Sequence, residues 1–230
     1  MHRFFLFLAM IAMATLPAAG GEAKGVDWTA TVRVMPTGAY VTGNPQARVK
    51  LVEYLSYTCP HCSHFAISGG PALRSDFIAR GTTSVEMRHA VRDRLDFVAT
   101  LLARCGGPAR FGQTSHAIFA NQPEWLDRGY RFEMAEGERI AKLSISEGAK
   151  LIMRGAGLDG LMRELGYSDA QLDKCLVDPV QQKLIGAMTK AAWDEAKIPG
   201  TPHFLINGKD VKDTVTWADL APKLQAAAGQ

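Results

Sequence analysis

The alternation of apolar and polar residues predicts β-strands near the start of the chain. Trp28–Met35 partly alternates between the two classes, and GNPQA at Gly43–Ala47 has the composition of a turn. Val49–Leu55 (VKLVEYL) is a nearly unbroken apolar run, as expected for a strand that is covered on both faces, and Ser84–Val91 is again strand-like. This part of the chain is therefore expected to contribute strands to a sheet with a buried centre.

Helical periodicity appears after the buried strand and then dominates the middle of the chain. A helix is expected from about Cys59 to Arg80, with a break at SGGP in Ser68–Pro71. One more helix is expected from Pro179 to Lys197. Between Asp93 and Asp178, apolar residues recur at helical spacing in Leu95–Ala103, Pro108–Asn121, Glu138–Met153 and Ala170–Val177.

The last part of the chain returns to strands. Phe204–Ile206 and Lys209–Val211 flank an Asn207–Gly208 turn, which is a strong signal of a β-hairpin, and Asp219–Ala227 closes the chain as a helix. A strand–helix–strand half and a hairpin–helix half thus enclose a block of helices. This order predicts an α/β domain split by a helical insertion, with a first half at 24–92, the insertion at 93–190 and a second half at 191–230.

The N-terminal residues have the order of a secretory signal peptide. Arg3 supplies a positive charge, Phe4–Leu16 is an apolar run too short to cross a bilayer, and small residues follow. We therefore expect residues 1–20 to be a signal peptide, cleaved somewhere within 19–23, and the mature protein to be exported to the periplasm. The alternatives are an uncleaved anchor and a buried N-terminal helix.

Net charge gives no reason to expect a polyanionic partner. The 230-residue chain has a formal net charge of +3, which becomes +2 if Arg3 is removed with the signal peptide (3 − 1). So small a charge does not favour binding to nucleic acid or to an anionic membrane surface. Export matters more, because thiols then meet an oxidising compartment and all four cysteines become candidates for disulfides.

The strongest chemical signal is the Cys59–Cys62 pair in YTCPHCSHF, at the expected junction of a strand and a helix. The first turn of a helix has unpaired N–H groups and a partial positive charge, which stabilise a thiolate at Cys59. Cys62 follows one turn later on the same face, within the span of a disulfide. Pro60 is tolerated in a first turn, and His61 offers the anion a further stabilising partner.

A stabilised thiolate determines the direction of the redox chemistry. It favours the reduced form and is a good leaving group in the oxidised form, so substrate thiols should readily reduce a Cys59–Cys62 disulfide. For this two-electron couple, about 1.4 kcal/mol of preferential stabilisation shifts the potential by about 30 mV. The pair is therefore predicted to oxidise other proteins rather than to stabilise its own fold.

A second segment supports a redox site. Thr201–Pro202, after Gly200, is a bond that suits a cis peptide, a geometry nearly restricted to proline. The CPHC motif after the LVEYLSYT strand, the GTP of Gly200–Pro202, FLINGK at Phe204–Lys209 and the helical insertion together resemble the DsbA-like branch of the thioredoxin superfamily. The resemblance covers nearly the whole mature chain and implies an α/β, thioredoxin-like fold with an inserted helical domain.

Residue roles follow from this resemblance. It implies that Cys59 is the exposed attacking sulfur, that Cys62 is its buried partner and that His61 tunes the pair. Pro202 corresponds to the cis-proline that faces them. Glu53 matches the buried acid of the family, which would carry protons to and from Cys62. Because a buried acid is costly without such a role or a good partner, the alternative is an edge-strand carboxylate in water.

The other two cysteines, Cys105 and Cys175, fall in the predicted helical insertion. In an oxidising compartment we expect them to be joined, and a bridge closing about 70 residues would stabilise the fold by about 4 kcal/mol in the chain-entropy model. The alternative is two unrelated buried thiols. A second redox-active pair is disfavoured, because neither cysteine has a nearby partner in sequence.

The sequence thus predicts a protein thiol:disulfide oxidoreductase that donates its Cys59–Cys62 disulfide to exported proteins with free thiols. The resemblance implies re-oxidation by a DsbB-like membrane quinone reductase, and no organic cofactor is implied. A monomer is expected, because residues 24–48 are too few for the N-terminal dimerisation domain of isomerase relatives.

Two alternatives stay open. A disulfide isomerase or reductase on the same fold is favoured by Thr201, because the strong oxidants of the resembled family carry valine at this position. A periplasmic metal-binding protein is the other alternative, because Cys59, Cys62, His61 and His64 are ligand types for zinc or copper. Against it, the sequence contains no second ligand cluster at the usual spacing.

Overall fold

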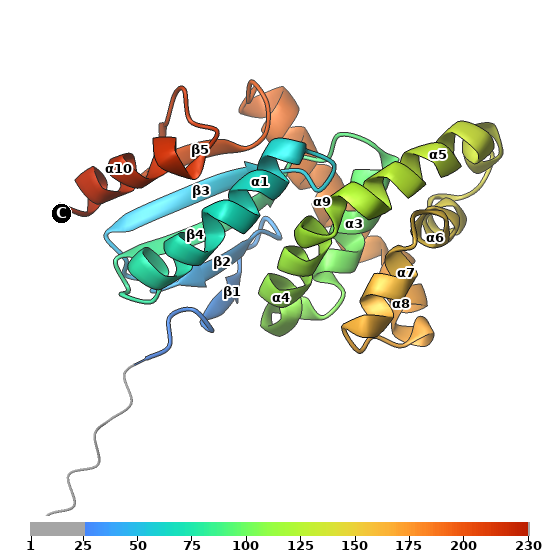
Figure 1. Cartoon of the computed structure of the whole chain (residues 1–230), viewed down its shortest axis with the longest axis horizontal. Coiled ribbons are helices and arrows are strands. Elements are labelled where there is room, and N and C mark those ends of the chain that lie inside the picture. The colour runs from blue at the N-terminus through green and yellow to red at the C-terminus, as the bar shows by residue number, and fades with distance from the viewer. Residues whose placement is uncertain (1–25, 230) are drawn as a thin grey trace, which may run out of the picture.

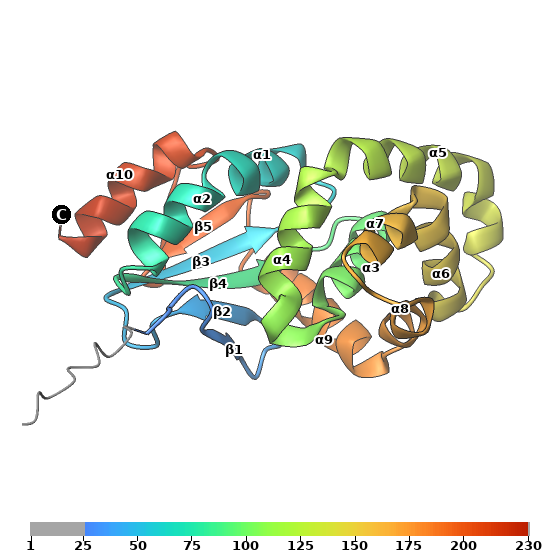
Figure 2. The ribbon, with the colours of Figure 1, turned by 60° about the horizontal axis from the view of Figure 1, so that its bottom comes forward.

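The computed structural model describes residues 26–229, so the predicted signal peptide lies outside the described residues. A mixed β-sheet flanked by helices forms one end of the molecule, and a block of helices forms the other (Figures 1 and 2). Within residues 26–229, every helix is too short or too polar to cross a membrane.

The sheet has six strands in the order β1-β2-β4-β3-β5-β6. β3 and β4 run parallel, and the other neighbouring strands pair antiparallel. Six of the seven residues of β3 are buried, because β3 lies between β4 and β5 with helices over both faces. The strands are β1 (Val32–Val34), β2 (Tyr40–Gly43), β3 (Val49–Leu55), β4 (Thr83–His89), β5 (His203–Ile206) and β6 (Lys209–Asp210).

The strand predictions were confirmed in the centre of the sheet and wrong at one edge. The predicted central strand and the hairpin are present, and the Asn207–Gly208 turn has the positive φ angles that a tight hairpin requires (51° and 77°). The strand predicted at Trp28–Met35 is shorter, because the N–H of Thr29 donates to the Asp27 carboxylate (2.9 Å) and the chain turns there. β2 was not predicted.

Helices cover both faces of the sheet. The helix predicted after Cys59 breaks at Gly69, as expected from the SGGP sequence. Phe65 and Leu220 pack with Leu51 on one face, whereas Ala192 packs with Val52 on the other. The first face carries α1 (Pro60–Ser68), α2 (Gly70–Ala72), the π-helical turn η1 (Leu73–Ile78) and α10 (Trp217–Ala228), and the second carries α9 (Pro179–Lys190) and η2 (Ala191–Glu195).

The helical block shares one large core with the adjoining edge of the sheet, in which Leu102, Phe111 and Leu158 are fully buried. Its boundaries at 93 and 190 stay a prediction, because α9 contacts both the block and β4. The block consists of α3 (Arg94–Arg104), α4 (Gly107–Ala120), α5 (Gln122–Ile140), α6 (Ile145–Ala156), α7 (Leu158–Glu164) and α8 (Asp169–Leu176).

The single helix predicted at Glu138–Met153 was wrong. α5 ends at Ile140, and α6 begins after Ser144, whose hydroxyl and backbone form a capping box with Glu147. This Ser-x-x-Glu spacing is a helix-start signal within the predicted helix. Most of α5 and all of α7 were also missed.

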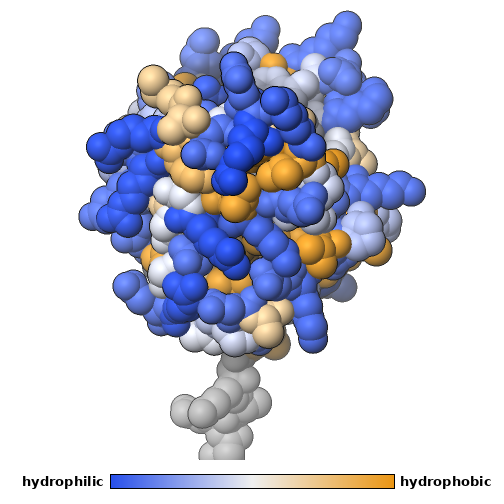
Figure 3. Space-filling view, turned by 90° about the vertical axis from the view of Figure 1, so that its right-hand side faces the viewer, coloured by the Kyte–Doolittle hydropathy of each residue, from blue (hydrophilic) through white to orange (hydrophobic). Residues whose placement is uncertain are grey.

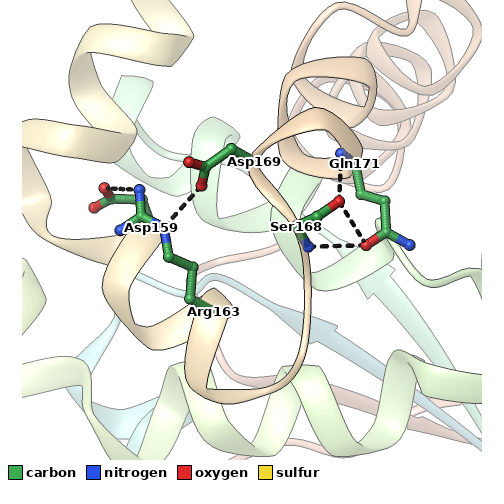
Figure 4. Close-up of polar contacts among 5 residues, drawn as sticks. All are labelled: Asp159, Arg163, Ser168, Asp169 and Gln171. Carbon is green, nitrogen blue, oxygen red and sulfur yellow. Dashed lines mark hydrogen bonds and ion pairs between the residues drawn. The ribbon is translucent and has the colours of Figure 1, made fainter.

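Polar contacts hold the turn that leads into α8 (Figure 4). Arg163 forms ion pairs with Asp159 (3.0 Å) and Asp169 (2.7 Å), and Ser168 caps α8 through a capping box with Gln171. α8 then places Cys175 beside Cys105 at the end of α3, where the two form a disulfide with a Cα–Cα distance of 5.3 Å. This bond joins segments 70 residues apart.

Candidate redox site

The Cys59–Cys62 pair lies at the start of α1, next to the end of β3. Cys59 is the N-cap residue with an extended backbone (φ −90°, ψ 116°), and Pro60 occupies the first turn, where it leaves no hydrogen bond unmade. Both cysteines are free thiols in this structure. The predicted position of the pair, at a strand-to-helix junction with a buried strand before it, is therefore observed.

The prediction that Cys59 is exposed was wrong. Only 3 % of its surface is accessible, and Cys62 is fully buried. Cys59 is buried by a segment that is distant in sequence. The segment before β5 covers the start of α1 and brings the Thr201 carbonyl oxygen to 3.1 Å from the Cys59 sulfur. A substrate thiol therefore meets only a small accessible part of Cys59.

The electrostatics of the site favour a thiolate at Cys59. A hydrogen bond from the Cys62 thiol is the main cause that lowers the pKa of Cys59 to about 5, and the Thr201 hydroxyl and the N–H groups of Cys62 and His61 lower it further. Burial opposes these effects. The N–H contribution is the one expected from the unpaired donors of a first helical turn.

The partner thiol is shifted in the opposite direction. Burial raises the pKa of Cys62 well above its usual value, and the hydrogen bond to Cys59 and the nearby charges of Cys59 and Glu53 raise it further. At neutral pH, the reduced site therefore holds one proton on Cys62 and a negative charge on Cys59. The two sulfurs have distinct chemical roles before any substrate arrives.

Thr201 contacts Cys59 from the other half of the sheet domain, and the position of Pro202 facing the two sulfurs stays a prediction. The Thr201–Pro202 peptide bond is cis, and Pro202 is buried. The two polar groups of Thr201 act on Cys59 in opposite ways. Its hydroxyl donates to the thiolate, whereas its carbonyl accepts only from the protonated thiol.

His61 and Pro60 have exposed side chains. His61 lowers the pKa of Cys59 through its backbone N–H, which donates to the thiolate. Any residue other than proline can supply such a donor. The tuning role that the resemblance gives to the His61 ring therefore stays a prediction.

Glu53 is buried in the middle of β3, on the face that carries α1. The alternative of an edge-strand carboxylate in water was wrong, because β3 is the central strand of the sheet. Burial raises the pKa of Glu53 to about 7. The carboxyl also lines a cavity of about 510 Å³ between the sheet, α1 and α4, together with Phe65 and Phe119. Its role as a proton carrier for Cys62 stays a prediction.

The helical block holds the loop that leads into Cys59. The buried Asp96 carboxylate accepts from the N–H groups of Tyr57 (2.7 Å) and Arg92 (3.0 Å), and the Thr58 hydroxyl donates to Asp93 (2.9 Å). Burial raises the pKa of Asp96 to about 7. Sequence reasoning missed these acids. An acid within the apolar RLDFVATLL segment was the available signal.

The sequence of residues 36–226 matches the family model described as Thioredoxin. The chain belongs to the thioredoxin family. The thioredoxin superfamily predicted from the sequence is confirmed. One solved structure, titled a protein-disulfide isomerase from Novosphingobium aromaticivorans, is 31 % identical, with a TM-score of 0.78, and the match covers 83 % of this chain and 97 % of that one.

Other similar proteins carry related names. A candidate protein-disulfide oxidoreductase from Rickettsia bellii is 27 % identical over 73 % of this chain and 56 % of its own length. This thioredoxin-family chain therefore spans only about half the length of the curated relatives that it matches. Wolbachia pipientis alpha-DsbA1 shares the fold, with a TM-score of 0.61, 20 % identity, and coverage of 85 % of this chain and 94 % of its own.

Replacing Glu53 with glutamine tests the buried acid of this thioredoxin-family site. Because the pKa of Glu53 rises on folding from about 4.5 to about 7, the unfolded chain releases this proton first as the pH increases. The stability of the wild type should therefore fall by about 3 kcal/mol between pH 4.5 and pH 7 on account of this group, and stay level above pH 7. Because Asp96 contributes a decline of its own over the same pH range, denaturant unfolding at several pH values should show a decline in Glu53→Gln that is smaller by this amount. An identical pH profile in the variant would contradict the assignment.

The surroundings of the site contain an apolar groove but no metal cluster. Within residues 26–229, no three His, Cys, Asp or Glu side chains are grouped to hold a metal ion. The groove, about 540 Å³ in volume, lies between α3 and α6, and Asp93, which binds Thr58, is on its wall. Figure 3 shows the end of the molecule that the helical block forms, where apolar side chains lie among hydrophilic ones. Leu143 and Ile145, which line the groove, are exposed.

Proposed function

We propose that this thioredoxin-family protein is a periplasmic thiol:disulfide oxidoreductase that donates its Cys59–Cys62 disulfide to exported proteins. The observation that carries the proposal is the opposite character of the two thiols. The pKa of Cys59 is lowered to about 5, whereas that of Cys62 is raised well above its usual value. Stabilising the thiolate stabilises the reduced enzyme, which makes the disulfide an oxidant.

The exchange proceeds in two steps that balance electrons. A substrate thiolate attacks the Cys59 sulfur of the disulfide, so a mixed disulfide forms and Cys62 leaves as a thiolate that takes up a proton. A second substrate thiolate then attacks the substrate sulfur of the mixed disulfide and releases Cys59 as its stabilised thiolate. The substrate loses two electrons as its disulfide forms, and the enzyme gains them.

Several parts of this proposal rest on the sequence and on the names of relatives. The periplasmic location rests on the signal-like residues 1–20, and the names of the Rickettsia relatives support the oxidoreductase activity. A DsbB-like membrane quinone reductase is the proposed re-oxidising partner, and the enzyme is proposed to act as a monomer. The exchange between thiols needs no organic cofactor.

A disulfide isomerase is the second candidate function. Two observations favour it: the Novosphingobium structure carries that name, and the residue before the cis-proline is Thr201, where strong oxidants of the resembled family have valine. An isomerase acts from its reduced form, so it should reactivate a substrate with scrambled disulfides in the absence of any oxidant. The oxidase should instead form disulfides in a fully reduced substrate.

The test of the oxidase proposal is equilibration with glutathione buffers, combined with titration of the reduced protein by thiolate absorbance. The titration should show a midpoint near pH 5. The potential should lie closer to about −120 mV, as for a strong oxidant, than to about −270 mV, as for thioredoxin. A thioredoxin-like potential, or a Cys59 that ionises only in alkaline solution, would refute the proposal.

A further inference from the structure

One side chain of the helical block binds the backbone on both sides of Thr58. Gln122, in the first turn of α5, donates from Nε2 to the carbonyl oxygens of Tyr57 (2.7 Å) and Cys59 (3.0 Å). It is buried, with 3 % of its surface accessible. An amide nitrogen has two hydrogens, so both donors are used, and both bonds cross from the helical block to the redox loop.

Of the two bonds, the one from Gln122 to the Cys59 carbonyl oxygen acts directly on the redox site. The same oxygen accepts from the Ser63 N–H (3.2 Å), which is the first backbone bond of α1. Gln122 therefore fixes the residue at which the loop becomes a helix. The orientation of the Cys59 backbone in turn sets how its sulfur faces the N–H groups of His61 and Cys62, which donate to the thiolate.

We propose that Gln122 is a positioning residue: acting through the Tyr57 and Cys59 carbonyls, it holds Cys59 in the orientation in which its thiolate is stabilised. The helical insertion would thereby help to set the redox potential of the site. This inference rests on the proposed oxidoreductase function. A side chain that only satisfied two buried carbonyls would stabilise the oxidised and reduced forms equally and leave the potential unchanged.

The experiment compares two variants of Gln122 with a matched control. Gln122→Met removes both donors at similar volume, and Gln122→Glu keeps the shape but places acceptor oxygens against the two carbonyls. The control is Gln182→Met, because Gln182 also donates to a backbone carbonyl within the helical part, that of Leu176 (2.8 Å), and its other hydrogen bond, to the Ser146 hydroxyl (3.3 Å), lies there as well. Each protein is titrated by thiolate absorbance and equilibrated with glutathione, and its unfolding is measured in both redox states.

Gln122→Met is expected to raise the midpoint of the Cys59 titration by about one pH unit, which is a tenfold change in ionisation. The equilibrium constant for oxidation of glutathione by the protein should fall by about the same factor, because the reduced form loses this stabilisation. Gln122→Glu should produce a larger change in the same direction. Gln182→Met should lower the unfolding midpoint without altering the titration or the equilibrium constant.

The outcomes separate this inference from the proposed function. If the wild type titrates as an ordinary thiol, the proposed function fails whatever the variants do. If the wild type is oxidising and both Gln122 variants stay within twofold of its equilibrium constant, the positioning role is refuted and Gln122 is structural only. If Gln122→Met does not fold, Gln122→Leu, which also lacks both donors and adds no charge, decides by the same two measurements.

Discussion

A Cys59→Ser variant is expected to lose thiol–disulfide exchange by more than about three orders of magnitude. A hydroxyl neither ionises near neutral pH nor forms a disulfide, and Cys62 does not replace the missing thiolate because burial keeps its pKa well above the usual value. The loss should be measured as the rate at which the protein, pre-incubated with an oxidant, forms disulfides in a reduced, unfolded substrate.

The complementary Cys62→Ser variant should behave differently, since it keeps the attacking sulfur. Its Cys59 thiolate reacts with a disulfide and forms a mixed disulfide, but no neighbouring thiol resolves the adduct. Covalent complexes sensitive to reductant should therefore accumulate and be visible by mass spectrometry of the intact protein. Adducts formed by Cys59→Ser instead, at Cys62, would reverse the assignment of the two sulfurs and contradict the proposal.

The central parts of the site were predictable because they depend on local sequence. The apolar run of β3, the Cys59–Cys62 spacing after it and Pro60 in a first helical turn all belong to one short segment. Local geometry alone places unpaired N–H groups against the first sulfur, and the lowered pKa of Cys59 agrees with that argument. The buried state of Glu53 also followed from its place in an apolar strand.

The parts that were missed depend on contacts between distant segments. The low exposure of Cys59 results from the loop at Thr201, 142 residues away, and the bonds of Gln122 and Asp96 to the redox loop join segments 63 and 39 residues apart. A glutamine at the start of a helix has no sequence signal for such a role. The missed break between α5 and α6 is different, because its capping box was visible in the sequence.

These missed contacts change how the helical insertion is understood. The sequence shows it as a block of helices between two halves of a domain. In the structure, Asp93, Asp96 and Gln122 from that block bind the two residues that precede Cys59 and the carbonyl of Cys59 itself. Residues of both the sheet domain and the insertion therefore determine the conformation at the start of α1.

The double variant Cys105→Ala, Cys175→Ala is expected to be less stable by about 4 kcal/mol. The bond closes a loop of 70 residues that contains α4 to α7, and without it the unfolded chain regains the conformational freedom of this whole segment. For a protein of this size the loss corresponds to a fall of roughly 10 °C in the melting temperature. Denaturant unfolding of wild type and variant, both with Cys59 and Cys62 oxidised, measures the difference.

The redox chemistry serves as the internal control for this variant. Cys105 and Cys175 lie at the ends of α3 and α8, and neither contributes to the pKa of Cys59. The titration midpoint and the glutathione equilibrium of the double variant should therefore match those of the wild type, while its stability is reduced. A variant that keeps full stability would show that the unfolded chain is already constrained without the bond. A shifted titration midpoint of Cys59 would show that loss of the disulfide displaces α3 and, through Asp96, alters the redox loop.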